Sequence, residues 1–130
     1  MGRYMEKVSV VIITFNEEKN IERCLESVRW ADEIVVVDTF STDRTVEICR
    51  RFTDRVFQES WRGYGLQKNL CASKANNRWV LNVDADEVIS PECAEAIRDV
   101  LASELKHPVY RFPRKNFFGN LMIRMIRQIW

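Results

Sequence analysis

The segment Val8-Ser9-Val10-Val11-Ile12-Ile13-Thr14 decides the fold of this chain. It is rich in β-branched residues and almost continuously apolar, which is typical of a strand buried on both faces of a sheet. After a short loop, apolar residues recur between positions 20 and 28 with the i, i+3, i+4, i+7 spacing of an amphipathic helix. A buried strand followed at once by a helix indicates an α/β unit.

The alternation of strand and helix continues along the chain. Short apolar runs predict further strands at residues 34–37, 55–58, 79–83 and 109–112. Helices are expected from the capping residues Ser41-Thr42-Asp43 to about residue 51, from about 66 to 75 after Gly63-Tyr64-Gly65, and from Ser90-Pro91-Glu92 to about 105. This pattern predicts an α/β fold with a mostly parallel sheet flanked by helices.

The composition fits one compact domain. The chain has 130 residues, of which 46% are hydrophobic, so it can bury a core and is not a disordered segment. The longest apolar runs, Val10–Ile13 and Ile34–Val37, are far shorter than the roughly 20 residues of a transmembrane helix. Residues 1–7 lack the apolar core of a signal peptide. We therefore expect a cytoplasmic protein.

The four cysteines favour a structural role over a metal site. Cys24, Cys49, Cys71 and Cys93 form no C-x-x-C pair, and the chain has one histidine, whereas structural zinc sites need ligands a few residues apart. All four lie in the expected helices, mostly beside apolar neighbours. We expect buried, unpaired thiols in a reducing compartment.

The charge is unevenly distributed. Residues 1–108 carry all nineteen acidic residues and a net charge of −4, whereas residues 109–130 carry five basic residues and no acidic one. A basic segment that is also rich in Phe, Ile and Met is a candidate surface for an anionic partner. For residues 114–130, an amphipathic helix packed on the sheet and contact with a lipid-linked or phosphorylated acceptor remain equal alternatives. Nucleic acid is not expected as a partner, because the chain contains no recognised nucleic-acid module.

Polar residues follow three of the expected strands. The first strand leads into Thr14-Phe15-Asn16-Glu17, the second into Asp38-Thr39, and the strand at 79–83 into Asp84-Ala85-Asp86-Glu87. Ligands of open α/β sheets bind outside the carboxyl ends of the strands. We therefore expect these side chains to meet at one edge of the sheet.

The tripeptide Asp84-Ala85-Asp86 has two interpretations. In an extended segment, residues i and i+2 project to the same side, so the two carboxylates could share Mg²⁺, whose remaining ligands would be water and phosphate oxygens. The alternative is a solvated acidic turn before the helix at Ser90. The position after a buried strand, with acidic partners on neighbouring strand ends, favours the metal site.

Other nucleotide and phosphate motifs are absent or fit poorly. The first strand is not followed by G-x-G-x-x-G, and the chain has no G-x-x-x-x-G-K-[ST]. A phosphatase or phosphotransferase of the haloacid-dehalogenase type would also use Asp84-Ala85-Asp86. In those enzymes the motif opens the domain, whereas here 44 residues follow Asp86, so this interpretation is second.

Five ordered motifs carry a family resemblance. They are Val10-Val11-Ile12-Ile13-Thr14-Phe15-Asn16-Glu17-Glu18-Lys19-Asn20-Ile21, Ile34-Val35-Val36-Val37-Asp38, Ser41-Thr42-Asp43-Arg44-Thr45, Gln67-Lys68-Asn69 and Asp84-Ala85-Asp86-Glu87. Over roughly residues 8–120 the chain resembles family 2 glycosyltransferases, most closely the bacterial lipopolysaccharide-core enzymes. The resemblance implies a Rossmann-like GT-A fold. It also implies a nucleotide-sugar-binding α/β domain at residues 1–108 and the basic, apolar start of an incomplete acceptor-side region at 109–130.

The resemblance implies a role for individual residues. Nucleotide binding is implied for Thr14, Phe15, Glu17, Asp38, Lys68, Asn69 and Asp84. Asp38 would accept a hydrogen bond from the base, for which the N3–H of uracil is suited. A divalent metal, Mg²⁺ or Mn²⁺, is implied at Asp86 with Asp84. One departure is that many family members have a second acid directly after the position of Asp38, where this chain has Thr39.

The implied activity is inverting, metal-dependent transfer of a sugar, with UDP-sugar as the expected donor. The acceptor would be a saccharide or a lipid-linked molecule, as in lipopolysaccharide or cell-envelope glycan synthesis. The general base is unassigned and expected beyond residue 130; Glu87 is more simply an exposed acid at a turn. Trp61 is expected either to line the sugar pocket or to pack in the core or a loop. Because the family extends further, a truncated, non-catalytic nucleotide-sugar-binding module is the alternative, and residues 111–130 are a candidate for peripheral membrane contact or self-association.

Overall fold

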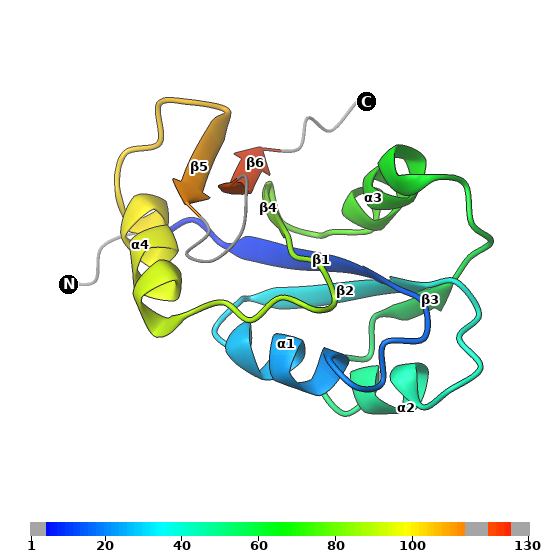
Figure 1. Ribbon diagram of the computed structural model, residues 1–130. Coiled ribbons are helices and arrows are strands. Elements are labelled where there is room, and N and C mark those ends of the chain that lie inside the picture. Colours follow the sequence, from blue (N-terminus) through cyan, green and yellow to red (C-terminus); the bar gives the residue numbers. More distant parts are fainter. Residues whose placement is uncertain (1–4, 114–119, 126–130) are drawn as a thin grey trace.

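The computed structural model describes residues 5–113 and 120–125, which build one six-stranded sheet with helices on both faces (Figure 1). The elements in chain order are β1 (Val8–Thr14), α1 (Ile21–Ser27), β2 (Glu33–Asp38), α2 (Thr45–Cys49), β3 (Val56–Gln58), α3 (Tyr64–Ser73), β4 (Trp79–Asn82), α4 (Pro91–Ala102), β5 (Val109–Pro113) and β6 (Asn120–Met125). The strand order across the sheet is β3-β2-β1-β4-β6-β5. The expected α/β fold is confirmed.

The sheet has a parallel part and an antiparallel part. β1 pairs in parallel with β2 and β4, and β2 with β3, whereas β6 pairs antiparallel with both β4 and β5. The strand expected at residues 109–112 is confirmed as β5. The alternative of an amphipathic helix over 114–130 is wrong for residues 120–125, which form β6. They form a strand because the backbone groups of β4 on one side and of β5 on the other are available for hydrogen bonding. Residues 114–119 and 126–130 lie outside the described part of the chain.

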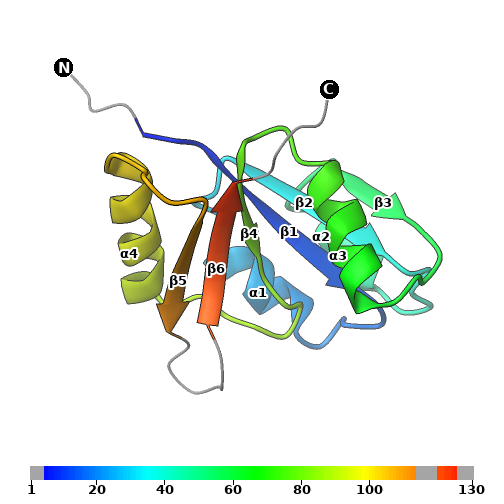
Figure 2. The same cartoon turned by 90° about the horizontal axis from the view of Figure 1, so that it is seen from above.

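An apolar core lies on each face of the sheet. Successive side chains of β1 point to opposite faces, so this strand contributes to both cores. Val10 and Ile12 point into the larger core, which α1, α2 and α4 cover, whereas Val11 points into the smaller core under α3. Figure 2 shows α3 on the upper face of the sheet, with α1 and α2 beyond it. Each fully buried Val or Ile contributes about 1.5–3 kcal/mol from removal of apolar surface from water. Burial on both faces explains why this strand reads as continuously apolar.

The helix ends differ from the expectation in one informative place. Ser90 caps α4 as expected, since its Oγ accepts a hydrogen bond from the Cys93 N–H at 3.1 Å, and Pro91 occupies the first turn. The second expected helix begins only at Thr45, and its N-cap makes no side-chain hydrogen bond. The expectation of capping is wrong for Ser41 and Thr42, whose hydroxyls donate to Asp38 and Asn16 at the ends of β2 and β1. It is confirmed for Asp43, whose Oδ1 accepts from the Thr45 N–H at 2.9 Å.

The expectation of buried thiols is confirmed for Cys24, Cys49 and Cys71, whereas Cys93 is only half-buried. All four are unpaired, and each lies in a helix. Burial raises the pKa of Cys24, Cys49 and Cys71 to about 12. Thiols with such pKa values stay protonated at neutral pH, which suits small apolar core residues rather than reactive groups.

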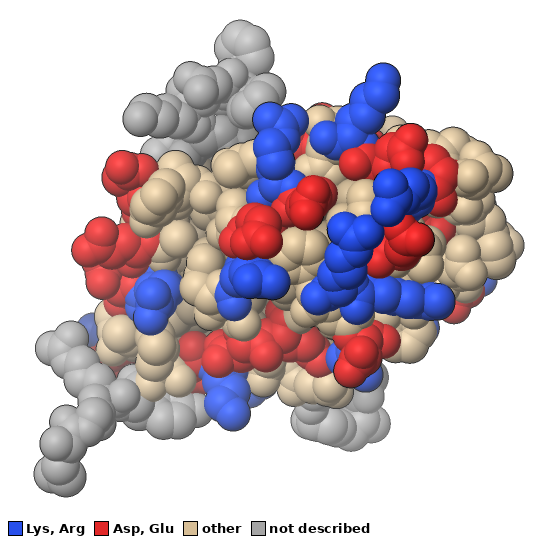
Figure 3. All heavy atoms as spheres, turned by 90° about the horizontal axis from the view of Figure 1, so that it is seen from below, with Lys and Arg blue, Asp and Glu red and all other residues tan. Residues whose placement is uncertain are grey.

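The face that carries α1 and α2 is covered by charges of both signs (Figure 3). On this face, Glu47 receives ion pairs from Arg44 at 2.7 Å and Arg51 at 3.4 Å. The side chains of all three are more than half exposed, so each pair contributes little to stability. The mixture of signs is typical of a solvated helical face. None of the described helices is long and apolar enough to cross a bilayer.

Candidate functional site

The loops that follow β1, β2 and β3 meet α3 around a pocket of about 610 Å³. Its lining residues are Ile13, Thr14, Phe15, Glu17, Thr39, Trp61 and Tyr64. We call it the carboxyl-edge pocket, because it lies at the carboxyl ends of the parallel strands. The expectation that polar residues from separate strand ends meet at one edge is met for the ends of β1 and β2.

Hydrogen bonds between the loop after β1 and the loop after β2 hold these two loops together at the carboxyl edge. The Asn16 N–H donates to Ser41 Oγ at 2.8 Å, and Asn16 Oδ1 accepts from the Thr42 N–H at 2.8 Å. The Glu17 N–H donates to Thr45 Oγ1 at 2.8 Å. Asn16 adopts a positive φ of 50°, a conformation that asparagine tolerates better than most residues. The motif Ser41-Thr42-Asp43-Arg44-Thr45 therefore clamps the first loop.

Asp43 anchors the same clamp. Its Oδ1 accepts from Thr45 Oγ1 at 2.5 Å and from the Thr45 N–H at 2.9 Å, and its Oδ2 accepts from the Glu18 N–H at 3.2 Å. Desolvation raises the pKa of the Asp43 carboxyl, but these hydrogen bonds outweigh it and hold the pKa below its ordinary value. The charged form of Asp43 thus stabilises the loop arrangement.

Asp38 lies beneath the pocket rather than in it. The residue is fully buried, and Oδ1 accepts from Thr14 Oγ1 at 2.6 Å and from Ser41 Oγ at 2.5 Å, while Oδ2 accepts from the Ser41 N–H at 2.8 Å. Thr14 and Asp38 are also register partners in the β1–β2 pair. The contact with a base that the resemblance implies for Asp38 would require this carboxylate to become exposed.

The next residue, Thr39, faces the pocket. Its hydroxyl accepts a hydrogen bond from the side-chain amide of Gln67 at 3.3 Å. Gln67 is fully buried in α3, and its Oε1 accepts from the Arg62 N–H at 3.2 Å. The sequence interpretation assigned no role to Gln67 and treated Thr39 only as a departure. Period-two alternation offers the missing signal, since Asp38 and Thr39 must point to opposite faces.

Exposed aromatic rings form the rim of the carboxyl-edge pocket. Trp61 and Tyr64 are 49% and 71% exposed, and Phe15 across from them is 56% exposed. The Trp61 and Tyr64 rings stack edge to face, with centroids 4.8 Å apart and planes at 87°. Trp61 is therefore a pocket residue and not part of the core. Large apolar rings left in water around a hollow are a mark of ligand contact.

The structure brings Lys68 and Asp84 together from opposite sides of the edge. Lys68 lies on α3, one turn after Tyr64, and its Nζ is 3.7 Å from Asp84 Oδ1. The two side chains are 40% and 45% exposed, so the pair is weak and can open to admit an anionic ligand or a cation. Asn69 follows Lys68 on α3 and is exposed.

The acidic tripeptide forms a turn, and the expected extended geometry is wrong. The Glu87 N–H donates to the Asp84 carbonyl at 2.9 Å, and Glu87 Oε1 accepts from the Asp84 N–H at 2.8 Å. The physical reason is Ala85, which is only 5% exposed and packs in the larger core, so the chain bends around it. Asp86 is exposed and Asp84 is half-exposed.

These two carboxylates fit a cation that a ligand helps to bind. Mg²⁺ takes one or two carboxylates and fills its remaining positions with water and phosphate oxygens, and Asp84 and Asp86 supply such oxygens at a solvent-open turn. Within residues 5–113 and 120–125, no group of three or more His, Cys, Asp or Glu is placed to hold a metal. The donor set suits a metal bound jointly with a phosphate ligand, rather than a resident structural ion.

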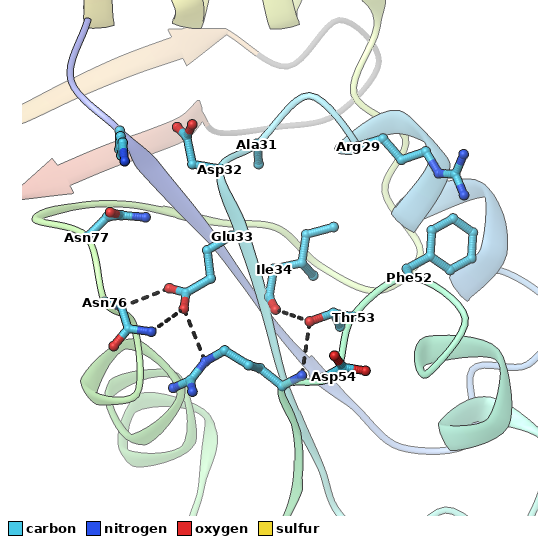
Figure 4. Close-up of a pocket in the computed structure, with 12 residues that line it drawn as sticks. Arg29, Ala31, Asp32, Glu33, Ile34, Phe52, Thr53, Asp54, Asn76 and Asn77 are labelled. Carbon is cyan, nitrogen blue, oxygen red and sulfur yellow. Dashed lines mark hydrogen bonds and ion pairs between the residues drawn. The ribbon is translucent and has the colours of Figure 1, made fainter.

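A second pocket of about 570 Å³ lies at the opposite, amino edge of the parallel strands (Figure 4). We call it the amino-edge pocket; it includes Glu33, Arg55 and Asn76. Glu33 Oε1 accepts from Ser9 Oγ at 2.7 Å and from the Asn76 N–H at 2.8 Å, and Oε2 lies 2.7 Å from Asn76 Nδ2 and 3.1 Å from Arg55 Nε. Figure 4 shows the side chains of Glu33 and Asn76 pointing toward one another.

The strand order, the two helical layers and the pocket at the carboxyl edge define an α/β protein with the GT-A fold. Residues 9–128 match the family described as Glycosyl transferase family 2. The chain therefore belongs to this family, as the resemblance indicated.

Two relatives with similar sequences are also glycosyltransferases by name. The chain is 45% identical over 100 residues to the uncharacterized glycosyltransferase RT0209 of Rickettsia typhi, which covers 76% of this chain and 34% of that protein. It is 33% identical over 115 residues to the lipopolysaccharide core biosynthesis glycosyltransferase LpsC of Rhizobium meliloti, covering 85% of this chain and 43% of LpsC. The chain thus spans between about a third and less than half of these relatives.

Solved structures with similar folds have been determined with nucleotides bound. Staphylococcus aureus TarS in complex with UDP-GlcNAc has a TM-score of 0.60 and 30% identity, covering 72% of this chain and 30% of TarS. Mycobacterium tuberculosis glucosyl-3-phosphoglycerate synthase in complex with Mg²⁺ and UDP has a TM-score of 0.53 and 26% identity, covering 64% of this chain and 34% of the synthase.

Proposed function

We propose that this chain is the donor-binding part of a glycosyltransferase, which moves a sugar from a nucleotide-diphosphate donor to a saccharide or lipid-linked acceptor. The proposed donor is a UDP-sugar. The single observation that carries the proposal is the carboxyl-edge pocket. Exposed aromatic rings form its rim. Lys68, one turn after the lining residue Tyr64 on α3, pairs with Asp84 after β4 at the same edge of the sheet. The family match and the UDP-bound relatives support it.

The proposed donor lies across the edge with its base among the aromatic side chains. Phe15, Trp61 and Tyr64 offer flat apolar surfaces on which a base can stack. Thr14 and Glu17 line the same pocket and supply polar groups for the base or ribose. Asp38 serves this site indirectly, since it holds Thr14 and the loop at Ser41 in place.

The diphosphate is proposed to lie toward Lys68, Asn69 and Asp84. Cleavage of the anomeric C–O bond leaves negative charge on the diphosphate, which the ammonium of Lys68, now paired with Asp84 at 3.7 Å, would stabilise. Asp84 and Asp86 would hold the divalent cation, Mg²⁺ or Mn²⁺. When bound, such a cation acts as a Lewis acid on the departing phosphate.

The acceptor side of the proposal rests on the relatives. LpsC is described as acting in lipopolysaccharide core biosynthesis, and we propose a related acceptor, a cell-envelope saccharide or glycolipid. Of the residues 111–130 predicted for membrane contact or self-association, 114–119 and 126–130 lie outside the described part of the chain, so this prediction stays open. No general base is assigned, and Glu87 is occupied at the turn by the Asp84 N–H.

Calorimetric titration tests the donor site. UDP with Mg²⁺ should bind the wild type, and Asp86→Ala should lower the affinity at least tenfold and remove the dependence on Mg²⁺. Asp99→Ala, an exposed acid on α4, is the matched control and should bind as the wild type does. Equal Mg²⁺-dependent binding by wild type and Asp86→Ala would show that Asp86 is not a metal ligand.

Release of UDP distinguishes the enzyme from a module that only binds the nucleotide. With a UDP-sugar and an acceptor supplied, the enzyme releases UDP, whereas a non-catalytic module binds the donor and leaves it intact. Phosphoryl transfer on Asp84, the remaining alternative, predicts a covalent acyl-phosphate on that residue, which mass spectrometry would detect.

A further inference from the structure

The loop between β3 and α3, residues 59–63, carries Trp61 to the rim of the carboxyl-edge pocket. The first residue of this loop is fastened to the end of β2, because the Glu59 N–H donates to the Asp38 carbonyl at 2.9 Å. Trp61 follows two residues later and is 49% exposed. The position of its ring therefore depends on how the far end of the loop, at Arg62, is held.

A buried amide on α3 holds that end of the loop. The Arg62 N–H donates to Gln67 Oε1 at 3.2 Å, and the Gln67 N–H donates to the Gly63 carbonyl at 2.9 Å. Because the Arg62 N–H can only donate, Oε1 is the end of the amide that faces it, and Nε2 donates to Thr39 Oγ1 at 3.3 Å. One side chain thus links the loop that carries Trp61 to the residue that follows β2.

Packing alone does not require an amide at this position. Gln67 lies on the inward side of α3 with Cys71 and Ala72, and all three residues are buried. An apolar side chain of the same length would also pack there, whereas a buried amide costs free energy unless it is hydrogen-bonded. Both partners of the amide, Arg62 and Thr39, belong to segments around the carboxyl-edge pocket. The amide therefore serves the pocket more than the core.

We propose that Gln67 is a positioning residue of the donor site. Its side chain has no exposed surface, so it acts through another residue, Trp61. The hydrogen bond from Arg62 to Gln67 holds the indole ring at the pocket rim, in edge-to-face contact with Tyr64. A ring that is already held loses less conformational entropy when the donor binds, which raises the affinity for the donor. The inference rests on the proposed function.

A double-mutant cycle tests this role by calorimetric titration of UDP with Mg²⁺. Gln67→Met keeps the length of the side chain and removes both of its hydrogen bonds, and it should weaken UDP binding about fivefold. Trp61→Ala should weaken it roughly tenfold. In the Trp61→Ala background, Gln67→Met should change the affinity by less than about twofold, because the ring through which Gln67 acts is gone. An equal loss in both backgrounds would overturn the inference.

Two control variants separate positioning from a general loss of stability. Gln67→Glu keeps one oxygen for the Arg62 N–H and a second oxygen to which the Thr39 hydroxyl can donate, so its UDP affinity should stay within about twofold of the wild type. Ser9→Ala removes another buried hydrogen-bonding side chain, at the amino edge, and should lower stability without changing UDP affinity. A loss of affinity in either control as large as that in Gln67→Met would overturn the inference.

Amide hydrogen exchange gives a measurement on the wild type that needs no variant. The Arg62 N–H should exchange at least about tenfold more slowly than in an unstructured peptide, because Gln67 Oε1 accepts from it. Normal UDP binding with an unprotected Arg62 N–H would overturn the inference alone, even if Gln67→Met does not fold. If the wild type does not bind UDP, the proposed function fails and the inference fails with it.

Discussion

The two edges of the parallel sheet carry pockets of nearly equal size, about 610 Å³ at the carboxyl edge and about 570 Å³ at the amino edge. Their side chains differ. At the amino edge, Glu33 is nearly buried and binds Ser9, Asn76 and Arg55. At the carboxyl edge, Phe15, Trp61 and Tyr64 stand about half or more exposed around the hollow.

This difference shows that volume does not mark a ligand site. Both oxygens of Glu33 at the amino edge already accept hydrogen bonds, from Ser9 and Asn76, so a ligand there would have to displace hydrogen bonds that already exist. The carboxyl edge instead leaves aromatic surface and the weakly paired Lys68 and Asp84 exposed to solvent. A ligand gains interactions at this edge without breaking strong ones, and the predictions below test the contrast.

The largest effect is expected from Glu33→Ala at the amino edge. The change removes the acceptor for Ser9 and Asn76 and leaves Arg55 without its ion pair, so the free energy of unfolding should fall by about 2–4 kcal/mol. UDP affinity at 20 °C should stay within twofold of the wild type. Urea denaturation and calorimetry measure the two quantities. Glu47→Ala, which removes only exposed ion pairs, serves as control and should leave the free energy of unfolding nearly unchanged.

The reverse behaviour is expected of Phe15→Ala at the carboxyl edge. Because Phe15 is 56% exposed, its truncation should change the melting temperature little. Loss of stacking should weaken UDP binding by about 1–2 kcal/mol, or roughly tenfold. Val88→Ala, which truncates another exposed apolar residue, is the matched control and should bind normally. Unchanged affinity in Phe15→Ala would remove the base from this part of the pocket.

A smaller, stabilising effect is expected at Phe40, next to Thr39. Phe40 has a φ of +51° and is 55% exposed, so it bears the strain of a left-handed conformation without burying its ring. Phe40→Gly should raise the free energy of unfolding by about 0.5–1 kcal/mol in urea denaturation, because relief of the left-handed strain exceeds the added entropy of the unfolded chain. Phe40→Ala removes the same ring but keeps the Cβ, and it should bring no gain. Equal stability of the two variants would contradict the strain interpretation.

The smallest effect is a pH dependence at Asp43. Hydrogen bonds hold its folded-state pKa below the ordinary value of 3.8. The stabilisation from its charge is therefore complete above that value and is lost as the pH falls through the lower, folded-state pKa. Asp43→Asn should flatten the acid limb of the stability curve below pH 4, measured by thermal melts. Identical acid limbs in both proteins would assign this pH dependence to other groups.

Most of the fold could be predicted from the sequence, because it depends on local patterns. The apolar runs gave β1, β2 and β4, and the capping pattern at Ser90 gave the start of α4. β6 could not be predicted, because residues 120–125 form a strand only through pairing with β4 and β5. Non-local pairing leaves no local signature when the segment is also compatible with a helix.

The candidate site was predicted in outline but not in its details. Thr14, Phe15 and Glu17 line the pocket, because the ends of parallel strands share an edge. The turn at Asp84–Glu87 was weighed only as the alternative to an extended metal site, since it depends on burial of Ala85 in the larger core. The role of Gln67 was also missed, because it depends on the distance between α3 and the end of β2.

The position of β6 has a consequence for synthesis of the chain. β6 is the last described strand to emerge from the ribosome, yet it lies between β4 and β5 in the finished sheet. Until residue 125 has been made, the hydrogen-bonding groups along one side of β4 remain unpaired, and β5 can pack on α4 but has no strand to pair with. An edge of this kind can pair with another nascent chain, so slow translation over residues 83–125 should increase aggregation of this protein.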